Sequence, residues 1–263
     1  MKKVVLRYLV VALAVSYLGC KKSDSQGPTA TGTTENYFPN NEGTNYKFSY
    51  SRIDSLGTHQ GIRFTRYGEK NTIFGTSYKI QIDSLVMATS IEVDSSYFRT
   101  TGSGVYYFID TTGFAASITD STLLQFLPFI KIDNELLSYS FPLLVGKYWT
   151  VFKMILNYPG SPTTTLVDVF AQAVSKDTIT LNLQNGPILK EAIKIKYTLL
   201  LTKNPTPPQV LQTFNAEAWI IQDIGPAKWE GSGTLVNIIT GLGIDFGDTT
   251  TVVNQSLIDY QIK

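Results

Sequence analysis

Cysteine and histidine are almost absent from this chain of 263 residues, which contains one of each, Cys20 and His59. A single cysteine excludes an intrachain disulfide, and a single histidine excludes a zinc site built from several histidines. Any Ser-His-Asp triad would have to use His59. That residue lies in the segment LGTHQG (56–61), whose composition is typical of a hairpin loop. We therefore expect no metal site, no cofactor and no triad.

Charged residues and long apolar runs are also scarce. Charged residues make up 16 % of the chain, below the usual quarter or so, and threonine, serine, tyrosine and isoleucine replace them. This composition is typical of an exported β-protein. Basic and acidic residues are nearly balanced, 22 against 21, so we expect no nucleic-acid partner. The apolar run at 8–15 is too short for a transmembrane helix, which needs about 20 residues.

The N-terminal segment has the anatomy of a signal peptide. Three basic residues within positions 2–7 precede the apolar run at 8–15, and Gly19 stands directly before Cys20. A small residue followed by cysteine resembles the bacterial lipobox. In that family the cysteine thiol receives a diacylglyceryl group and the chain is cut just before it. The resemblance implies a signal peptide at 1–19 and a lipid-modified Cys20.

The residues after Cys20 predict a tether and a location. Removal of 1–19 leaves 244 residues with 19 basic and 21 acidic side chains. Segment 20–36 lacks large apolar residues, so we expect a flexible tether. Two or more acyl chains give stable anchoring. The residue that follows the cysteine is Lys21 rather than Asp, which resembles the pattern of lipoproteins sent to the outer membrane. We expect an outer-membrane anchor facing the periplasm or the cell surface, with the membrane as one partner.

The region 37–263 is predicted to be a mainly β domain. Apolar and polar residues alternate in seven segments, which indicates antiparallel strands with one face toward a core. These segments are 46–50, 62–65, 78–83, 91–94, 178–183, 193–197 and 257–262. One exception, 120–127, has a capping residue and helical spacing before Pro128, and predicts one short helix.

The chain contains one internal echo. Residues 38–46 and 141–149 share Phe-Pro, a glycine and an aromatic residue at the same spacing. Two copies are too few for a solenoid. They indicate two subdomains divided near residue 138, or two related halves of one sheet.

Four phrases resemble those of uncharacterised lipoproteins from Bacteroidetes and related bacteria. Residues 37–48 resemble their "YFPL-x-x-G-x-x-W-x-Y" opening, and 141–149 are similar to an "FPL-x-VG-x-x-W" element. Residues 186–195 resemble a "GTF-x-x-A-x-K-V" hairpin, and 219–228 are similar to "W-x-A-x-G-V-G-x-V-K". The resemblance implies an antiparallel sheet, curved into a half-barrel like the lipoprotein-carrier fold. It implies no catalytic residue.

The three tryptophans are the candidate ligand contacts. Trp149, Trp219 and Trp229 could form a stacking platform for a sugar or line an apolar cavity. The alternative is that they belong to the core, where aromatic residues contribute the most buried area. We expect Trp149 and Trp219 in the core, because they lie in the patterned phrases, and Trp229 partly exposed.

Two acidic pairs raise the question of hydrolysis, because glycosidases need only two carboxylates. Glu92 and Asp94 share one face of a predicted strand. We expect Ile91 and Val93 to face the core, which would place the two acids in solvent. The second pair, at 133–135, has the composition of a loop.

These observations favour a cell-envelope lipoprotein with a non-enzymatic binding or structural role. Its ligand, whether a protein, a glycan or a lipid, stays open. One alternative is a carrier or sensor with an apolar ligand in a half-barrel cavity, which needs about 300–1,000 Å³. Another is a carboxylate-dependent envelope hydrolase. A surface binder would instead present an exposed aromatic or apolar patch.

Overall fold

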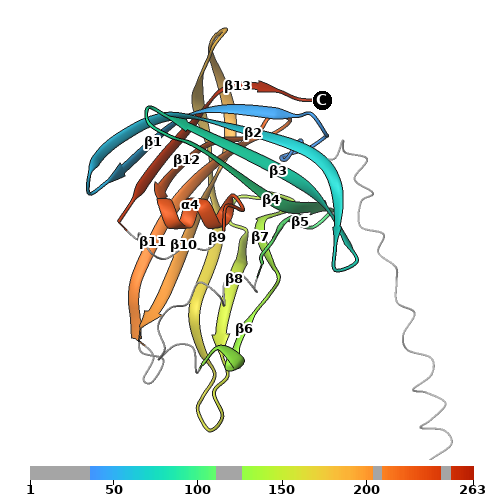
Figure 1. Cartoon of the computed structure of the whole chain (residues 1–263). Coiled ribbons are helices and arrows are strands. Elements are labelled where there is room, and N and C mark those ends of the chain that lie inside the picture. Colours follow the sequence, from blue (N-terminus) through green and yellow to red (C-terminus); the bar gives the residue numbers. More distant parts are fainter. Residues whose placement is uncertain (1–35, 111–125, 204–208, 244–249) are drawn as a thin grey trace, which may run out of the picture. The chain divides into compact units, whose positions relative to one another are not determined.

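The computed structural model describes residues 36–110, 126–203, 209–243 and 250–263 (Figure 1). Cys20, the leader and the tether up to residue 35 lie outside these ranges. So do residues 120–125, which hold most of the expected helix. Immediately after them the chain forms a short 3₁₀ turn, η1 (Leu127–Phe129).

Thirteen antiparallel strands of the described residues form one sheet. The strands are β1 (Asn45–Asp54), β2 (Gly57–Ile73), β3 (Thr76–Met87), β4 (Ile91–Thr101), β5 (Gly104–Phe108), β6 (Ile130–Ile132), β7 (Glu135–Ser140), β8 (Tyr148–Leu156), β9 (Thr164–Leu183), β10 (Gly186–Lys203), β11 (Gln209–Ile221), β12 (Gly225–Ser232) and β13 (Val252–Gln261). All seven alternating segments of the sequence fall on these strands, with only Ile262 lying beyond the end of β13.

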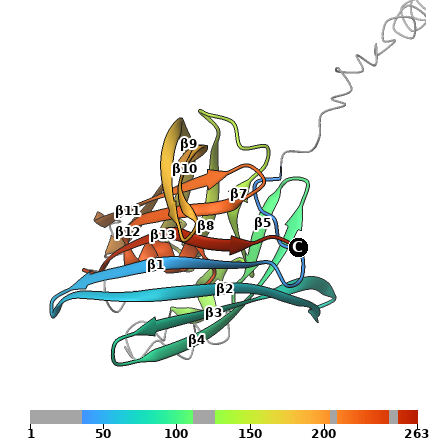
Figure 2. The same cartoon turned by 90° about the horizontal axis from the view of Figure 1, so that it is seen from above.

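The sheet consists of two meanders joined side by side. Strands β1 to β5 and then β7 neighbour one another in chain order, and so do β8 to β13; the first and last strands, β1 and β13, pair. The sheet is curved and open (Figures 1 and 2). The predicted curved antiparallel sheet is confirmed. Ser138, where the sequence suggested a subdivision, is fully buried in the middle of β7.

The internal echo corresponds to two equivalent turns. Gly43 and Gly146 have φ angles of 81° and 89°, in the left-handed region that favours glycine. Each turn leads into a strand, β1 or β8, whose second residue is a buried aromatic: Tyr46 or Trp149. The repeated phrase therefore marks the entry into the first strand of each meander.

One α-helix of the described residues, α4 (Gly233–Ile239), lies within the curve of the sheet (Figure 1). Every residue of α4 except Asn237 is buried. The helix is rich in β-branched residues, which are weak helix formers, so burial against the surrounding strands stabilises it rather than propensity. Thr240 Oγ1 donates to Val236 O over 2.8 Å at its C-terminal end. We did not expect this helix from the sequence.

An aromatic cluster fills one part of the core. The rings of Phe38 and Phe98 meet edge to face with centroids 5.5 Å apart, and Tyr67 lies 5.0 Å from Phe98. Tyr107 extends the cluster at 5.8 Å from Phe98. Such pairs contribute beyond their buried area, so Phe38, in the segment before β1, holds that segment against the sheet.

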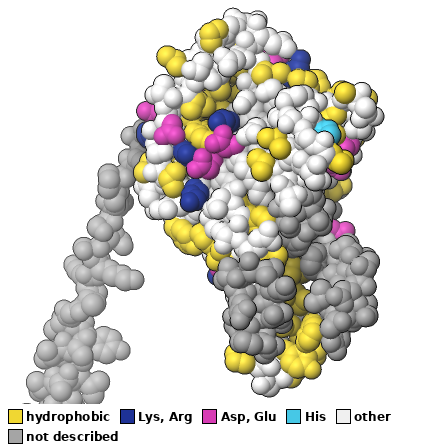
Figure 3. All heavy atoms as spheres, turned by 90° about the vertical axis from the view of Figure 1, so that its left-hand side faces the viewer, with side chains coloured by type: hydrophobic (Ala, Val, Ile, Leu, Met, Phe, Trp, Pro, Cys, Tyr) yellow, Lys and Arg dark blue, Asp and Glu magenta, His cyan; other side chains and the backbone are white. Residues whose placement is uncertain are grey.

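Charges on the outer face are mostly paired. Lys194 Nζ on β10 lies 2.7 Å from Glu217 Oε2 on the neighbouring strand β11, and Lys228 and Glu230 form a second pair within β12. Acidic and basic side chains are interspersed on the face drawn in Figure 3, and neither sign forms an extended field there.

Candidate functional site

A pocket of about 260 Å³ lies between α4 and the inner face of the sheet. Its walls come from β1 to β4, β13 and α4, and we call it the polar pocket. Its charged and amide side chains include Arg52, Arg63, Asp83, Glu92, Asp94, Asn237 and Gln255. The volume is close to the lower end of ligand pockets, about 300 Å³, so a small ligand fits.

The polar pocket exists because β2 and β3 turn polar side chains inward. Arg63 and Thr65 on β2 are buried, as are Gln81 and Asp83 on β3. Phe64, between the two buried polar residues of β2, is 42 % exposed. Alternation separates a strand's two faces, but which face is enclosed depends on what covers it. Here α4 packs over the polar face, and β13 extends that face on the other side of β1.

The same inversion continues on β4 and corrects part of our interpretation of the Glu92/Asp94 pair, whose two residues are exposed, as expected, but at the rim of the polar pocket. Both carboxylates line the polar pocket, whereas Ile91 and Val93 are 71 % and 63 % exposed. The register explains this arrangement, because Asp94 pairs with Asp83 and neighbours in a pair share a face. The expectation that Ile91 and Val93 face the core was wrong.

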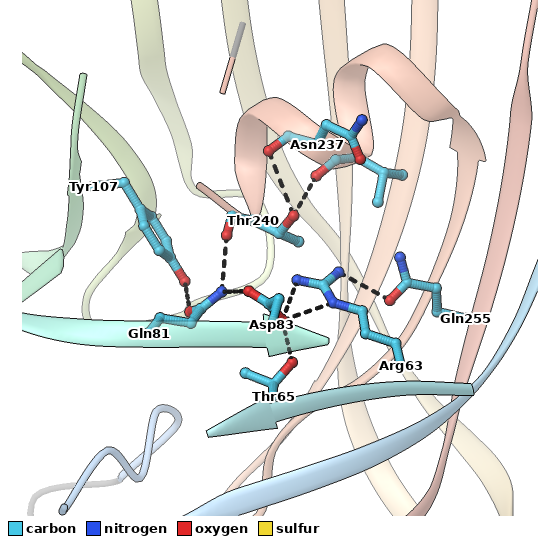
Figure 4. A network of polar contacts seen from close by, with 9 residues as sticks. Arg63, Thr65, Gln81, Asp83, Tyr107, Asn237, Thr240 and Gln255 are labelled. Atoms are coloured by element: carbon cyan, nitrogen blue, oxygen red, sulfur yellow. Dashed lines mark hydrogen bonds and ion pairs between the residues drawn. The ribbon is translucent and has the colours of Figure 1, made fainter. Parts of the chain in front are cut away.

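A buried ion pair forms the floor of the polar pocket (Figure 4). Arg63 Nε donates to Asp83 Oδ1 over 2.8 Å, and its terminal nitrogen lies 2.7 Å from the same oxygen. Thr65 Oγ1 also donates to Asp83 Oδ1. These contacts offset the cost of removing both charges from water, because a buried charge is tolerated when it is paired and hydrogen-bonded.

Gln81 links this ion pair to the helix. Its amide nitrogen donates to Asp83 Oδ2 over 2.7 Å and to Thr240 O over 3.1 Å. Tyr107 completes the network, because its hydroxyl donates to Gln81 Oε1 over 2.8 Å. Burial raises the pKa of Tyr107 well above its usual value, so the phenol keeps its proton and stays a donor. The end of α4 is therefore held against β3 by polar contacts.

Gln255 leaves a donor facing the polar pocket. Arg63 donates to Gln255 Oε1 over 3.1 Å, and because arginine has only donors, the amide oxygen must face it. The amide nitrogen then turns away from Arg63, on the side of α4 (Figure 4). It has no hydrogen-bond partner among the described residues, although Gln255 is only 1 % exposed. This donor is therefore free to bond to a molecule in the polar pocket.

Tyr50 provides a second polar group. Its ring lines the polar pocket, the residue is 9 % exposed, and its hydroxyl bonds to none of the described residues. Burial is the main cause that raises the pKa of Tyr50, so the hydroxyl stays neutral. The ring offers an apolar surface and the hydroxyl a hydrogen bond.

The three candidate tryptophans lie apart, and none lines the polar pocket. Trp149 is buried, and its Nε1 donates to Leu137 O over 3.2 Å. Trp229 is 4 % exposed and meets Phe48 edge to face at 5.1 Å. The expectation that Trp229 is partly exposed was therefore wrong, because its strand turns this side chain inward.

Trp219 is buried by side chains of neighbouring strands that cover its ring. It shares the outer face of the sheet with its cross-strand neighbours Lys194 and Lys228. Their Nζ atoms lie 5.0 Å and 4.3 Å from the ring centroid, and the indole nitrogen donates to Asp177 Oδ2 over 3.2 Å. The two lysines cover the ring, so it does not form a stacking platform.

The other candidate residues are engaged elsewhere. His59 Nε2 lies 3.2 Å from Asp54 Oδ1 near the β1–β2 turn. Glu135 is the first residue of β7 rather than part of a loop, and Arg99 donates hydrogen bonds to both of its carboxylate oxygens. Hydrogen bonds from Arg99 are the main cause that lowers the pKa of Glu135. Burial, with the hydrogen bond to Glu135, raises the pKa of Tyr78 to about 12.

Two further observations bound the chemistry of the described residues. They contain no group of three or more histidine, cysteine, aspartate or glutamate side chains that could hold a metal ion. Across the same ranges, no helix has the length and apolar character needed to cross a bilayer.

Comparison with known proteins gives two structural likenesses. No family model and no curated protein sequence matches the chain. Among solved structures, the chain is similar to a protein from Bacteroides fragilis, provisionally described as exported and with a YmcC-like fold. The identity is 12 %, the TM-score 0.44, and the match covers 87 % of this chain and 100 % of that one. A protein from Parabacteroides distasonis, provisionally described as a lipoprotein, has 13 % identity, a TM-score of 0.44, and coverage of 88 % and 100 %. A TM-score below 0.5 supports no inference about function.

Proposed function

We propose that this chain is a lipid-anchored cell-envelope protein that binds a small polar ligand in the polar pocket without transforming it. The leader supports the anchor, since a charged start, an apolar run and Gly19 precede the lone Cys20. Lys21 supports an outer-membrane location, and segment 20–36 would hold the β domain away from the lipid surface.

The observation that carries the binding role is the unpartnered amide nitrogen of Gln255 facing the polar pocket. It lies beside the ion pair of Arg63 and Asp83, which is buried at the pocket floor. A buried ion pair often adds little stability compared with apolar residues of the same volume. Because this ion pair lies beside an open pocket, next to the unpartnered donor of Gln255, a role in ligand recognition is favoured.

The lining argues against an apolar ligand. A lipid chain in the polar pocket would remove water from the carboxylates of Glu92 and Asp94 and from the Gln255 amide without replacing their hydrogen bonds. A second space, among Phe38, Tyr46 and Trp229, is apolar but holds only about 20 Å³. A polar ligand satisfies the groups that the polar pocket presents.

The contacts of the acids favour binding over hydrolysis. A glycosidase needs one carboxyl group with a raised pKa as the proton donor. Both oxygens of Asp83 accept hydrogen bonds, from Arg63, Thr65 and Gln81, and the pKa of Glu135 is lowered instead. Neither group is suited to donate a proton.

Binding can be tested by NMR on the isotopically labelled full chain in detergent. A library of small neutral, cationic and anionic polar compounds is added, and the side-chain amide signals of Gln255 and Asn237 are followed. We expect some compounds to shift the Gln255 signal. No shift with any compound would contradict the binding role, and chemical turnover of a bound compound would contradict the non-enzymatic one.

A matched pair of variants locates the binding. Asn237 is exposed on α4 at the polar pocket, so Asn237→Phe should fill the pocket and weaken binding. Asn254 points to the opposite face of β13, and Asn254→Phe should leave binding unchanged. Equal effects of the two variants would place the binding elsewhere.

A further inference from the structure

We infer that the ligand of the polar pocket is a small organic cation: an ammonium group on a body that also carries a hydrogen-bond acceptor. This inference rests on the proposed binding role and specifies its chemistry. Its basis is the balance of charges, the direction of the unpartnered groups and the exclusion of a metal-ion cluster.

Two carboxylates of the polar pocket have no basic partner among the described residues, whereas both of its arginines have an acidic one. Arg63 is neutralised by Asp83 at 2.7 Å. Arg52 Nε lies 3.2 Å from Asp54 Oδ2, outside the pocket lining. Glu92 and Asp94 form no ion pair within the described residues. The five charged side chains of the lining therefore sum to a formal charge of −1, and to −2 when Asp54, the partner of Arg52, is counted with them.

The register places these negative charges beside one another. Asp94 pairs directly with Asp83 across β3 and β4, and both side chains face the polar pocket. Glu92, two residues before Asp94, lies on the same face. Like charges directly opposite on neighbouring strands are destabilising. A bound cation between the β4 carboxylates would relieve this repulsion, and an anion would increase it.

Other groups indicate an organic ligand rather than a bare metal ion. The described residues include no acidic cluster that could hold a metal. Gln255 presents a donor, which suits a hydroxyl or carbonyl oxygen and repels a metal ion. Tyr50 adds an aromatic ring, which attracts ammonium groups through its face. An amino sugar or amino alcohol combines the required ammonium group and acceptor.

The test compares matched pairs of probes that differ in one amino group: glucosamine against glucose, and ethanolamine against ethylene glycol. Dissociation constants are measured by NMR titration of the full chain in detergent, at a pH where the amines are protonated. We expect the ammonium member of at least one pair to bind several-fold tighter, because it can pair with two carboxylates at once, although each exposed ion pair contributes little by itself. The preference should fall as salt is added.

Charge variants identify the residues responsible. The double variant Glu92→Gln/Asp94→Asn should remove the preference for the ammonium compound, and because both residues are exposed, the fold should tolerate it. The double variant Glu69→Gln/Asp259→Asn removes the same charge from exposed positions outside the pocket lining. It should keep the preference.

The outcomes separate this inference from the binding role. If the neutral compounds bind the pocket as tightly as the ammonium compounds, or if Glu92→Gln/Asp94→Asn keeps the preference, the cation inference is wrong and the binding role stands. If only anionic library compounds shift the Gln255 signal, the cation inference is likewise wrong and the binding role stands. If no compound of the library or the pairs shifts it, the binding role itself fails.

Discussion

Arg63 donates a hydrogen bond to Gln255 Oε1 over 3.1 Å, and this contact determines which end of the Gln255 amide faces the polar pocket. The two residues are 192 positions apart in the chain and meet because β13 pairs with β1, which pairs with β2. The junction of the two meanders thus brings a charge from one and an amide from the other to the same site.

Removal of Arg63 alone should destabilise the fold strongly. Arg63→Met leaves Asp83 buried without its cation, so we expect the free energy of unfolding to fall by about 3–5 kcal/mol. The double variant Arg63→Met/Asp83→Leu removes both charges and should lose less than the sum of the two single variants. Urea unfolding of the four proteins measures the coupling, and additive losses would contradict the ion pair.

The two faces of β4 should respond differently to truncation. Phe98 is fully buried, so Phe98→Ala should lower the free energy of unfolding by about 3–5 kcal/mol. Ile91 is 71 % exposed, so Ile91→Ala should change it by no more than about 0.5 kcal/mol. Thermal or urea unfolding provides the measurement. A large loss for Ile91→Ala would mean that the strand has the opposite orientation.

The Arg99–Glu135 contact should make stability depend on acid pH. The pKa of Glu135 in the folded protein is lowered below its usual 4.5. Its stabilising contribution is therefore fully present above pH 4.5 and is lost as the pH falls below that value. The difference in unfolding free energy between the native chain and Glu135→Gln should shrink as the pH falls from 6 to 3. Glu69→Gln, at an exposed position, should show no such trend.

Cys20 should determine whether the protein is anchored. Cys20→Ser removes the thiol that would carry the lipid, so we expect the protein to move from the detergent phase to the aqueous phase in detergent partition. Mass spectrometry of the mature N-terminus checks the modification directly. Ser23→Ala, three residues later, should keep both the lipid mass and the detergent partition. An unmodified Cys20 in the native chain would rule out the anchor.

The alternating segments of the sequence predicted the strands well. Each corresponds to a strand of the structure, and the echo of 38–46 in 141–149 marked the two turns that enter β1 and β8. These features are local, because alternation and turn glycines reflect backbone geometry within a few residues. The helix α4 was missed for the same reason: its sequence, GTLVNII, has the β-branched residues of a strand.

The polar pocket could not be predicted from the sequence. Arg63 stands between Ile62 and Phe64, where a polar residue usually faces water, and Gln255 stands between two further polar residues, Asn254 and Ser256, so neither pattern indicates burial. The only signal was a bulky apolar neighbour, Phe64 beside Arg63 and Ile91 beside Glu92, and such a neighbour fits either orientation of the strand. The Glu92/Asp94 pair was expected in solvent and is exposed, but it lies on the face that carries the polar pocket, whereas Ile91 and Val93 do not face the core.

By itself, the sequence determined the antiparallel strands, the entry turns and the shortage of thiol and imidazole groups, because these depend on residue identity and local periodicity. The tertiary structure alone decided which face of β2, β3 and β4 is enclosed. A strand has two faces that differ in polarity, and only the packing of α4 over one face of the sheet, with β13 paired beside β1, determined that Arg63, Asp83 and Gln255 would be buried there.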